Sequence, residues 1–328
     1  MRMLKLSNFL QARFNIFLYT VFGWGLARIY IFMLGKIYFL IRRDEKQIIE
    51  SSVTDVVNMI KRFNEREKIV KKVFNGILSH YYEKLFIAFE NKHKATEFLT
   101  RNVSASYISV IKRSLKKGKG VILITGHYGA IEYIPTLLAV NHVNISMIAK
   151  FKTPQLRKKI FKQADKYGIR MIDAGIKGNV LNNAINELRQ NRVIVTQCDE
   201  VDEWRASGNK KTTFLGQVTG LDRTINILHK RTGAEVVFGL LHRFSLDKYK
   251  FVAYSYEQIL DMIPSIQSKT TGEVVLKILE QFIYQYPEQW YQWKKFGKMI
   301  KSHVEVANDN QETGYLAPKI TFPVPDQA

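Results

Sequence analysis

The sequence contains a single cysteine, Cys198, among 328 residues. One thiol excludes a disulfide framework and any metal site built from several cysteines. The chain also lacks an HExxH pair, a CxxC pair and the Gly-Lys-Ser/Thr run of a phosphate-binding loop. We therefore expect neither a metal ion nor a nucleotide cofactor.

Acidic residues are scarce as well. The chain has 29 Asp and Glu against 50 Lys and Arg, which leaves a net charge of +21. Such a field suits an anionic partner: nucleic acid, an anionic membrane surface or an acidic carrier protein. The basic clusters are scattered along the chain, and no helix-turn-helix, zinc-finger or RNP-type pattern accompanies them. We therefore expect a membrane or carrier partner and no nucleic acid.

The N-terminal segment 14–41 is apolar and long enough to span a bilayer, but Arg28 and Lys36 interrupt it. It lacks the cleavage site of a signal peptide. Basic residues flank it on both sides, so the positive-inside rule selects no orientation. The alternative is a buried core helix. We favour residues 1–43 as an uncleaved anchor that either spans the membrane once or lies in its interface.

The rest of the chain divides into regions that differ in the spacing of their apolar residues. Apolar residues recur every three or four positions through 44–118, which indicates a helical region. From 119 to 302, short apolar runs such as "VILIT", "ISMIA", "IRMID", "VIVTQ" and "AEVVFGLL" alternate with helical stretches. This alternation predicts an α/β core with a mixed sheet flanked by helices, in which "KFVAYSYE" pairs with the strand before it. Residues 303–328 are predicted to form a loose tail.

The run "VILITGHYGAIEYIP" holds the first candidate for catalysis. A buried strand ends in Gly-His-Tyr-Gly, and Glu132 follows His127 by five positions. Residues five apart point in different directions on one helix, so His127 must lie in the turn with Glu132 reaching back to it. A His oriented by a carboxylate is a general base. The positive end of the following helix is expected to keep the ring neutral near pH 7. An ordinary strand-turn-helix joint remains the alternative.

The same spacing occurs a second time, in His242 and Asp247. That pair has no neighbouring glycine and no following helix, so we interpret it as structural, in a surface contact. Asp199 and Glu200, at the end of the "VIVTQ" strand, are further candidates to orient His127, or else solvated turn carboxylates. We expect Cys198 to be a core residue, although a nucleophilic role is conceivable.

The "TGHYGAIE" run resembles the His-x4-Asp/Glu motif of the glycerolipid acyltransferase superfamily, and its Glu form is similar to the bacterial lipid A (lauroyl and myristoyl) acyltransferases. Two further blocks agree in order. The segment 196–224 resembles that family's Asp-containing strand end, basic loop and Phe-Phe-Gly element, here Phe214-Leu215-Gly216, which opens a helix. The segment "YPEQWYQWKKF" (286–296) is similar to the family's closing signature.

The resemblance implies a glycerolipid-acyltransferase-like fold and transfer of a fatty acyl chain from acyl carrier protein or CoA to a hydroxyl of a membrane glycolipid such as a lipid A precursor. His127 would act as base and Glu132 as its orienter, with Asp199 as a third catalytic residue. Backbone N–H groups after His127 would hold the oxyanion. A monomer on the cytoplasmic face of the bacterial inner membrane is expected. The residues expected to contact substrate are Gly126, Gly129, Phe214, Gly216, Arg223, Arg243, Lys294 and Lys295.

Some positions depart from the family pattern. Lys294 and Lys295 stand where the family has paired arginines, and Leu215 replaces the second Phe. The glycerol-phosphate branch's Glu-Gly-Thr-Arg block is missing. A lysophospholipid or other lipid O-acyltransferase therefore remains an alternative. So does an inactive basic protein that binds lipid or nucleic acid.

Overall fold

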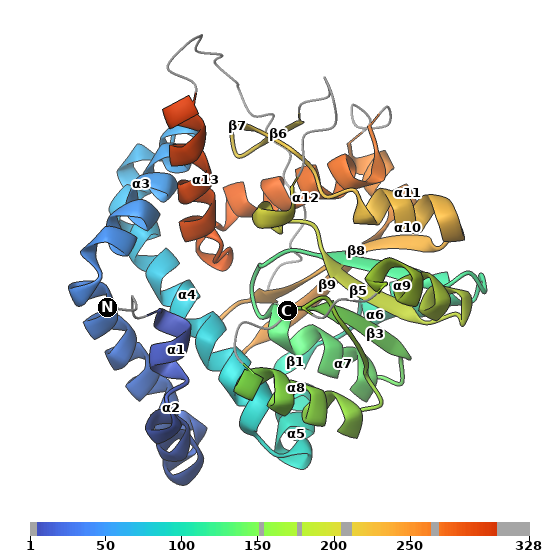
Figure 1. Ribbon diagram of the computed structural model, residues 1–328, viewed down its shortest axis with the longest axis horizontal. Helices are drawn as coiled ribbons and strands as arrows, with labels where there is room; N and C mark the ends of the chain where they lie inside the picture. The colour runs from blue at the N-terminus through green and yellow to red at the C-terminus, as the bar shows by residue number, and fades with distance from the viewer. Residues whose placement is uncertain (1–4, 151–153, 176–178, 205–211, 264–268, 307–328) are drawn as a thin grey trace.

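The computed structural model describes residues 5–150, 154–175, 179–204, 212–263 and 269–306 (Figure 1). The predicted loose tail falls outside the described residues from 307 onward. The chain begins with a helical part that ends in a two-residue edge strand. Its elements are α1 (Leu6–Leu10), α2 (Arg13–Ile41), α3 (Arg43–Met59), η1 (Phe63–Glu65), α4 (Arg66–Phe89), α5 (Lys92–Asn102) and β1 (Val103–Ser104).

The α/β part follows, and it begins with α6. Its first half contains α6 (Ile108–Leu115), β2 (Val121–Thr125), η2 (Ile131–Tyr133), α7 (Ile134–Val140), β3 (Ile145–Ala149), α8 (Pro154–Lys166), β4 (Arg170–Asp173), α9 (Val180–Arg189) and β5 (Val193–Gln197). The second half contains η3 (Val201–Glu203), β6 (Thr212–Phe214), β7 (Gln217–Thr219), α10 (Thr224–Thr232), β8 (Glu235–Arg243), β9 (Tyr249–Ser255), α11 (Tyr256–Met262), α12 (Thr271–Gln285), η5 (Pro287–Gln289) and α13 (Trp293–Val306).

The central sheet is mixed, as the sequence predicted. Its seven strands lie in the order β1-β9-β8-β2-β5-β3-β4. The pairs from β8 through β4 are parallel, whereas β9 runs antiparallel to β8, as expected for a strand that pairs with the one before it. Each apolar run named above forms a strand, because parallel strands between two helical layers are buried on both faces.

The two faces of the sheet contact different helices, following the period of two along each strand. Ile122, Ile124 and Ile194 belong to the core shared with α9, α10 and α12. The alternate residues of the same strands, such as Leu123 and Val195, belong to the core shared with α5, α6, α7 and α8 (Figure 1). The central strands are therefore fixed from both sides, and the turns at their carboxyl ends start from a rigid base.

Helix α2 lies at one end of the molecule and packs on α4 (Figure 1). Its 29 residues include a break at Gly23, where φ is 79°. Ala27, Ile31 and Leu34 point into the protein, whereas an outward side remains exposed. The exposed apolar residues of that side are Phe14, Phe17, Val21, Phe22, Leu26, Ile29, Met33, Ile37, Leu40 and Ile41. Among the described residues, α2 is the one helix long and apolar enough to cross a membrane.

Arg28, which interrupts the apolar segment in the sequence, faces the protein. Its guanidinium lies 4.5 Å from the centre of the Tyr82 ring and donates a hydrogen bond to the carbonyl oxygen of Leu246. Its charge is therefore directed toward the protein body. Lys36, the other interruption of the segment, is exposed beside Ile37.

The Phe214-Leu215-Gly216 element does not open a helix, as the sequence led us to expect. It forms the tight turn between the antiparallel strands β6 and β7, and the next helix begins at Thr224. Leu215 and Gly216 both have positive φ, 50° and 76°, as a type I′ hairpin turn requires. The strain at Leu215 is offset because its N–H donates to the buried carboxylate of Glu280.

The backbone of α4 touches the η5 turn at Gly76. A Cβ atom built there would lie 1.9 Å from the carbonyl oxygen of Glu288. We expect Gly76→Ala to lower the free energy of unfolding by about 1–3 kcal/mol, because backbone cannot move aside as a side chain can. Gly25→Ala is the matched control: it is helical, has no atom within 4 Å of a Cβ, and should stabilise the helix slightly. Denaturant unfolding in detergent measures both, and equal stabilities would contradict the tight contact.

Candidate active site

His127 lies in the turn after β2, where the sequence placed it. Gly129 follows with φ of 55°, and a Cβ there would lie 1.9 Å from the carbonyl oxygen of Leu241. A Cβ at Gly126 would meet the side chain of Leu279 at 2.5 Å. Both glycines are therefore required by the packing of the turn. Their predicted contact with substrate stays a prediction.

The ring of His127 contacts two carboxylates from the segment after β5. Nδ1 is 2.8 Å from Oδ1 of Asp199, and Nε2 is 3.2 Å from Oε1 of Glu200. Strands β2 and β5 are parallel neighbours, so the residues that follow them meet at one edge of the sheet. Asp199, expected as an alternative orienter, therefore occupies the position that the sequence assigned first to Glu132.

Asp199 is fully buried and accepts three kinds of hydrogen bond. Besides the His127 ring, it accepts from the backbone N–H of His127 at 2.9 Å and from the indole N–H of Trp290 at 2.6 Å. A buried carboxylate is stable only with such partners. The three contacts fix the plane of the carboxylate and, through it, the orientation of the imidazole.

The two carboxylates determine the charge of His127. Burial alone would lower its pKa, but Asp199 and then Glu200 outweigh burial and raise the pKa to about 9. The expectation of a ring kept neutral near pH 7 is therefore wrong for the free protein. The short η2 turn supplies too little dipole to compete with two adjacent negative charges.

Glu200 and Lys295 extend the cluster toward solvent. Oε2 of Glu200 lies 3.0 Å from Nζ of Lys295, which is also 3.1 Å from Oδ2 of Asp202. Burial opposes ionisation of Glu200, yet its contacts with His127 and Lys295 hold its pKa well below the usual range. Lys295 is thus the one predicted headgroup cation that the structure brings to the His127 cluster.

Glu132 faces helix α4. Its Oε1 is 3.1 Å from Nζ of Lys84 and 3.8 Å from Nε2 of His80. The expected hydrogen bond to His127 is replaced by these contacts, because the η2 turn, which contains Glu132, packs on α4. A catalytic role for Glu132 stays a prediction. The carboxylate that contacts the His127 ring directly, and so orients it, is that of Asp199.

An aromatic stack connects Glu132 to His127. The ring of His80 lies flat on Tyr291 with centroids 3.5 Å apart, and Tyr291 meets His127 edge-on at 5.3 Å. His80 is buried, and burial together with the charges of Lys84 and His127 lowers its pKa well below the ordinary value. The sequence analysis did not single out His80 and Lys84. Both lie on α4, the helix that the apolar spacing around Ile77 had predicted.

The other predicted substrate residues are placed differently. Arg243 forms a two-contact pair with Glu83, at 2.7 and 2.8 Å, so its guanidinium already has a partner and headgroup binding stays a prediction. Lys294 pairs with Glu45 at 2.5 Å on helix α3. Arg223 is exposed at the start of α10.

Phe214 is fully buried and packs edge-on against Trp290, Trp204 and Phe296. It therefore supports the indole that binds Asp199, and its contact with substrate stays a prediction. Gly216 belongs to the hairpin turn, where a Cβ would lie 2.6 Å from the sulfur of Met59.

The backbone amides after His127 are already used. Tyr128 donates to Gly126, Gly129 to Gln289 and Ala130 to Leu241, at 2.7, 2.8 and 2.9 Å. The expectation that these amides hold an oxyanion is therefore wrong. The N–H groups instead fasten the turn to η5 and β8.

His242 is structural but not a surface contact. It is buried, and its Nδ1 lies 2.8 Å from the hydroxyl of Tyr128. Burial, and then the charge of Arg243, lower its pKa to about 4. Asp247 is exposed and contacts Ser245. Cys198 is buried in the core, as expected, and burial raises its pKa well above the ordinary value.

The geometry supports a buried histidine base and does not suggest a metal site. Within the ranges given above, no group of three or more His, Cys, Asp and Glu residues is arranged to hold a metal ion. The chemistry available at this edge is proton transfer at Nε2 of His127, with the opposite nitrogen fixed by Asp199.

Comparison with known proteins places this arrangement in a family. The family described as "Bacterial lipid A biosynthesis acyltransferase" matches residues 17–295, which include most of α2, all of α4, both carboxylate-bearing turns and the Trp290 segment. The comparison with curated proteins gave no match. From the extent of the family match and the acid–base centre within it, the chain belongs to the bacterial lipid A biosynthesis acyltransferase family and is an acyltransferase.

Proposed function

We propose that the protein transfers a fatty acyl chain from a thioester, on acyl carrier protein or CoA, to a hydroxyl group of a membrane glycolipid such as a lipid A precursor. The observation that supports this most directly is the His127–Asp199 pair, because it provides a base whose second nitrogen is fixed by a buried carboxylate. A lysophospholipid acceptor would use the same chemistry, so the acceptor is decided by assay.

The proton moves in two steps. Nε2 of His127 takes the proton of the acceptor hydroxyl while the oxygen attacks the thioester carbonyl carbon. When the C–S bond breaks, the departing thiolate takes that proton back, which leaves an ester and a free thiol. Asp199 keeps the remaining ring proton on Nδ1 and stabilises the imidazolium between the steps. No covalent enzyme intermediate is needed.

Glu200 occupies the side of the ring where the acceptor hydroxyl must bind, since its Oε1 lies 3.2 Å from Nε2. The incoming hydroxyl has to displace it, and Glu200 has Lys295 as its other partner. Displacement removes one of the two negative charges that raise the pKa of His127. With the turn amides occupied, Lys295 is our candidate to stabilise the negative charge that forms on the carbonyl oxygen.

The outward side of α2 provides the contact with the membrane. Because α2 packs on α4 along its other side, we propose that it lies in the interface of the inner membrane, on the cytoplasmic face, with the exposed apolar residues in the lipid. In this arrangement the protein that carries the His127 cluster is held at the membrane that contains the acceptor lipid, and no spanning helix is needed.

His127→Ala should reduce acyl transfer by roughly 10²- to 10⁴-fold, the usual contribution of a general base. Asp199→Asn should also be damaging, because an amide can present an N–H to Nδ1 and select the wrong tautomer. Initial rates are measured with acyl carrier protein thioester and lipid A precursor, and separately with lysophospholipid. Melting curves confirm folding.

His242→Ala and Asp247→Asn are the matched controls, since they change the pair with the same spacing. His242→Ala should lower stability, because Tyr128 loses its buried partner, and should keep the rate. A His127→Ala protein with a near-normal rate would refute the proposed base.

The rate of acyl transfer should rise with pH. At pH 7, a group with a pKa of about 9 is neutral in roughly 1% of molecules, so the rate should increase about tenfold per pH unit before levelling near pH 9.

Glu200→Gln should shift the profile to lower pH, because it removes one charge that favours the imidazolium. Asp202→Asn is the control: it removes a charge that contacts Lys295 instead of His127. Identical profiles for wild type and Glu200→Gln would contradict this account.

Membrane attachment should depend on the outward side of α2. The triple change Leu26→Gln, Ile29→Gln and Met33→Gln should move the protein from the membrane fraction to the soluble fraction, because these side chains are exposed on that side. A salt wash should leave the wild type bound. The control, Val218→Gln with Phe63→Gln, changes exposed apolar residues outside α2 and should stay bound. Release of wild type by salt would show that charge alone holds it.

A further inference from the structure

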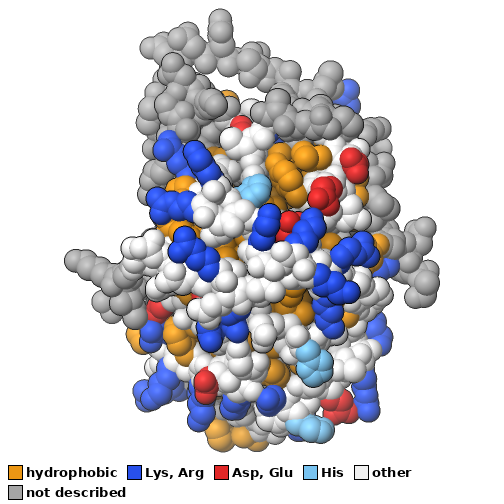
Figure 2. Space-filling model, turned by 90° about the vertical axis from the view of Figure 1, so that its right-hand side faces the viewer, with side chains coloured by type: hydrophobic (Ala, Val, Ile, Leu, Met, Phe, Trp, Pro, Cys, Tyr) orange, Lys and Arg blue, Asp and Glu red, His pale blue; other side chains and the backbone are white. Residues whose placement is uncertain are grey.

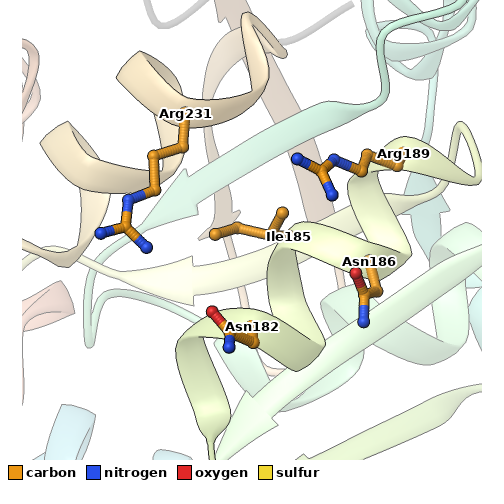
Figure 3. Close-up of a pocket in the computed structure, with 5 residues that line it drawn as sticks. All are labelled: Asn182, Ile185, Asn186, Arg189 and Arg231. Atoms are coloured by element: carbon orange, nitrogen blue, oxygen red, sulfur yellow. The ribbon is translucent and has the colours of Figure 1, made fainter.

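A polar pocket lies between α9 and α10, outside the site described above. Its volume is about 340 Å³, and it is lined by Asn182, Ile185, Asn186, Arg189 and Arg231. Figure 3 shows that Arg231 extends from α10 and Arg189 from α9 toward the space over Ile185. Ile185 is buried and forms the apolar floor.

The two arginines have no acidic partner in the described part of the chain, whereas the neighbouring carboxylates do. Glu187, on the same helix as Arg189, contacts Arg170 at 3.1 Å and Arg192 at 3.0 Å. Glu235, just after α10, contacts Lys117 at 2.8 Å. The pocket therefore holds two uncompensated positive charges beside two amide side chains.

We propose that this pocket binds a phosphate group. Guanidinium groups donate paired hydrogen bonds that match phosphate oxygens, and side-chain amides of Asn182 and Asn186 add further donors. A cation in the last turn of a helix is also favoured by the helix dipole, which explains one arginine on each helix. The dipole does not explain why both side chains approach the same cavity.

The surroundings of the pocket attract anions. Exposed cations without ion pairs among the described residues stand on α6, in the turn after it and on α10: Lys112, Arg113, Lys116, Lys119 and Lys230. Asn191, at the end of α9, ties these segments together by donating to the carbonyl of Leu115 and accepting from the N–H of Gly120. Figure 2, which faces the right-hand side of Figure 1 where α9 and α10 lie, shows more Lys and Arg side chains than Asp and Glu. Such a field raises the local concentration of an anionic ligand.

The pocket is separate from the His127 cluster. Arg189 and Arg231 precede β5 and β8, whereas His127 and Asp199 follow β2 and β5. Five residues of strand, about 16 Å, therefore separate the two edges. Helix α2 lies at the other end of the molecule (Figure 1). A lipid in the bilayer that holds α2 is therefore distant, which favours a water-soluble phosphorylated ligand.

The test measures phosphate binding by the full chain in neutral detergent at low salt. Isothermal titration with inorganic phosphate and with glycerol 3-phosphate forms the soluble arm. Flotation with phosphatidylcholine vesicles, with and without phosphatidic acid, forms the lipid arm. The pocket variant is Arg189→Gln with Arg231→Gln. The control, Arg113→Gln with Lys116→Gln, removes the same charge from the same face.

The pocket variant should bind the soluble phosphates at least roughly tenfold more weakly than wild type, since it loses charge-assisted hydrogen bonds. The control should change binding by less than about twofold. Pocket-dependent binding to phosphatidic acid vesicles alone would support the phosphate site and assign it to a lipid headgroup. Equal weakening in both variants, or no binding in either arm, would overturn the proposal. Because the readout is binding, the result is independent of acyl transfer.

Discussion

The candidate site depends on one buried carboxylate. Asp199 receives the backbone N–H and the ring of His127 from the turn after β2, and the indole of Trp290 from the segment after η5. It thus joins three parts of the chain that are distant in sequence. Phe214 and Phe296 close around Trp290, so the aromatic cluster keeps water from the carboxylate and the hydrogen bonds satisfy its oxygens. Removal of any of these parts would loosen the base.

The sequence predicted six of the seven strands of the central sheet and placed His127 in the turn after one of them. The two-residue edge strand β1 lies in the region predicted to be helical. The runs that form β2, β5 and β8 are almost entirely apolar because these strands are buried on both faces, whereas β4 at the sheet edge includes the exposed Arg170. His127 was found as a residue between two glycines at a strand end, and Asp199 as a carboxylate at the end of the "VIVTQ" strand. They meet because residues that follow neighbouring parallel strands lie at one edge of the sheet. The family signature around Trp290 also marked the right segment.

The contacts that each charged side chain makes could not be predicted from the sequence in the same way. Glu132 is near His127 in sequence, but a short 3-10 turn directs it toward Lys84 on α4. Arginine is usually a surface residue, so the sequence suggested that Arg243 is exposed. Only the structure shows that α4 places Glu83 beside it. Leu215 takes a positive φ that propensity disfavours, because Glu280 receives its N–H. In each case a contact across the fold outweighed a local preference.

The position of Glu200 bears on the choice between water and acceptor. A thioester beside an uncovered base is open to hydrolysis, which would waste the activated chain. Here a carboxylate already covers Nε2 of His127. Water gains little by displacing it, whereas the hydroxyl of a lipid acceptor is held in place by the rest of the lipid and competes with the advantage of a tethered group. The contact of Glu200 with Nε2 of His127 thus favours a nucleophile that is already bound to the protein through the rest of its molecule.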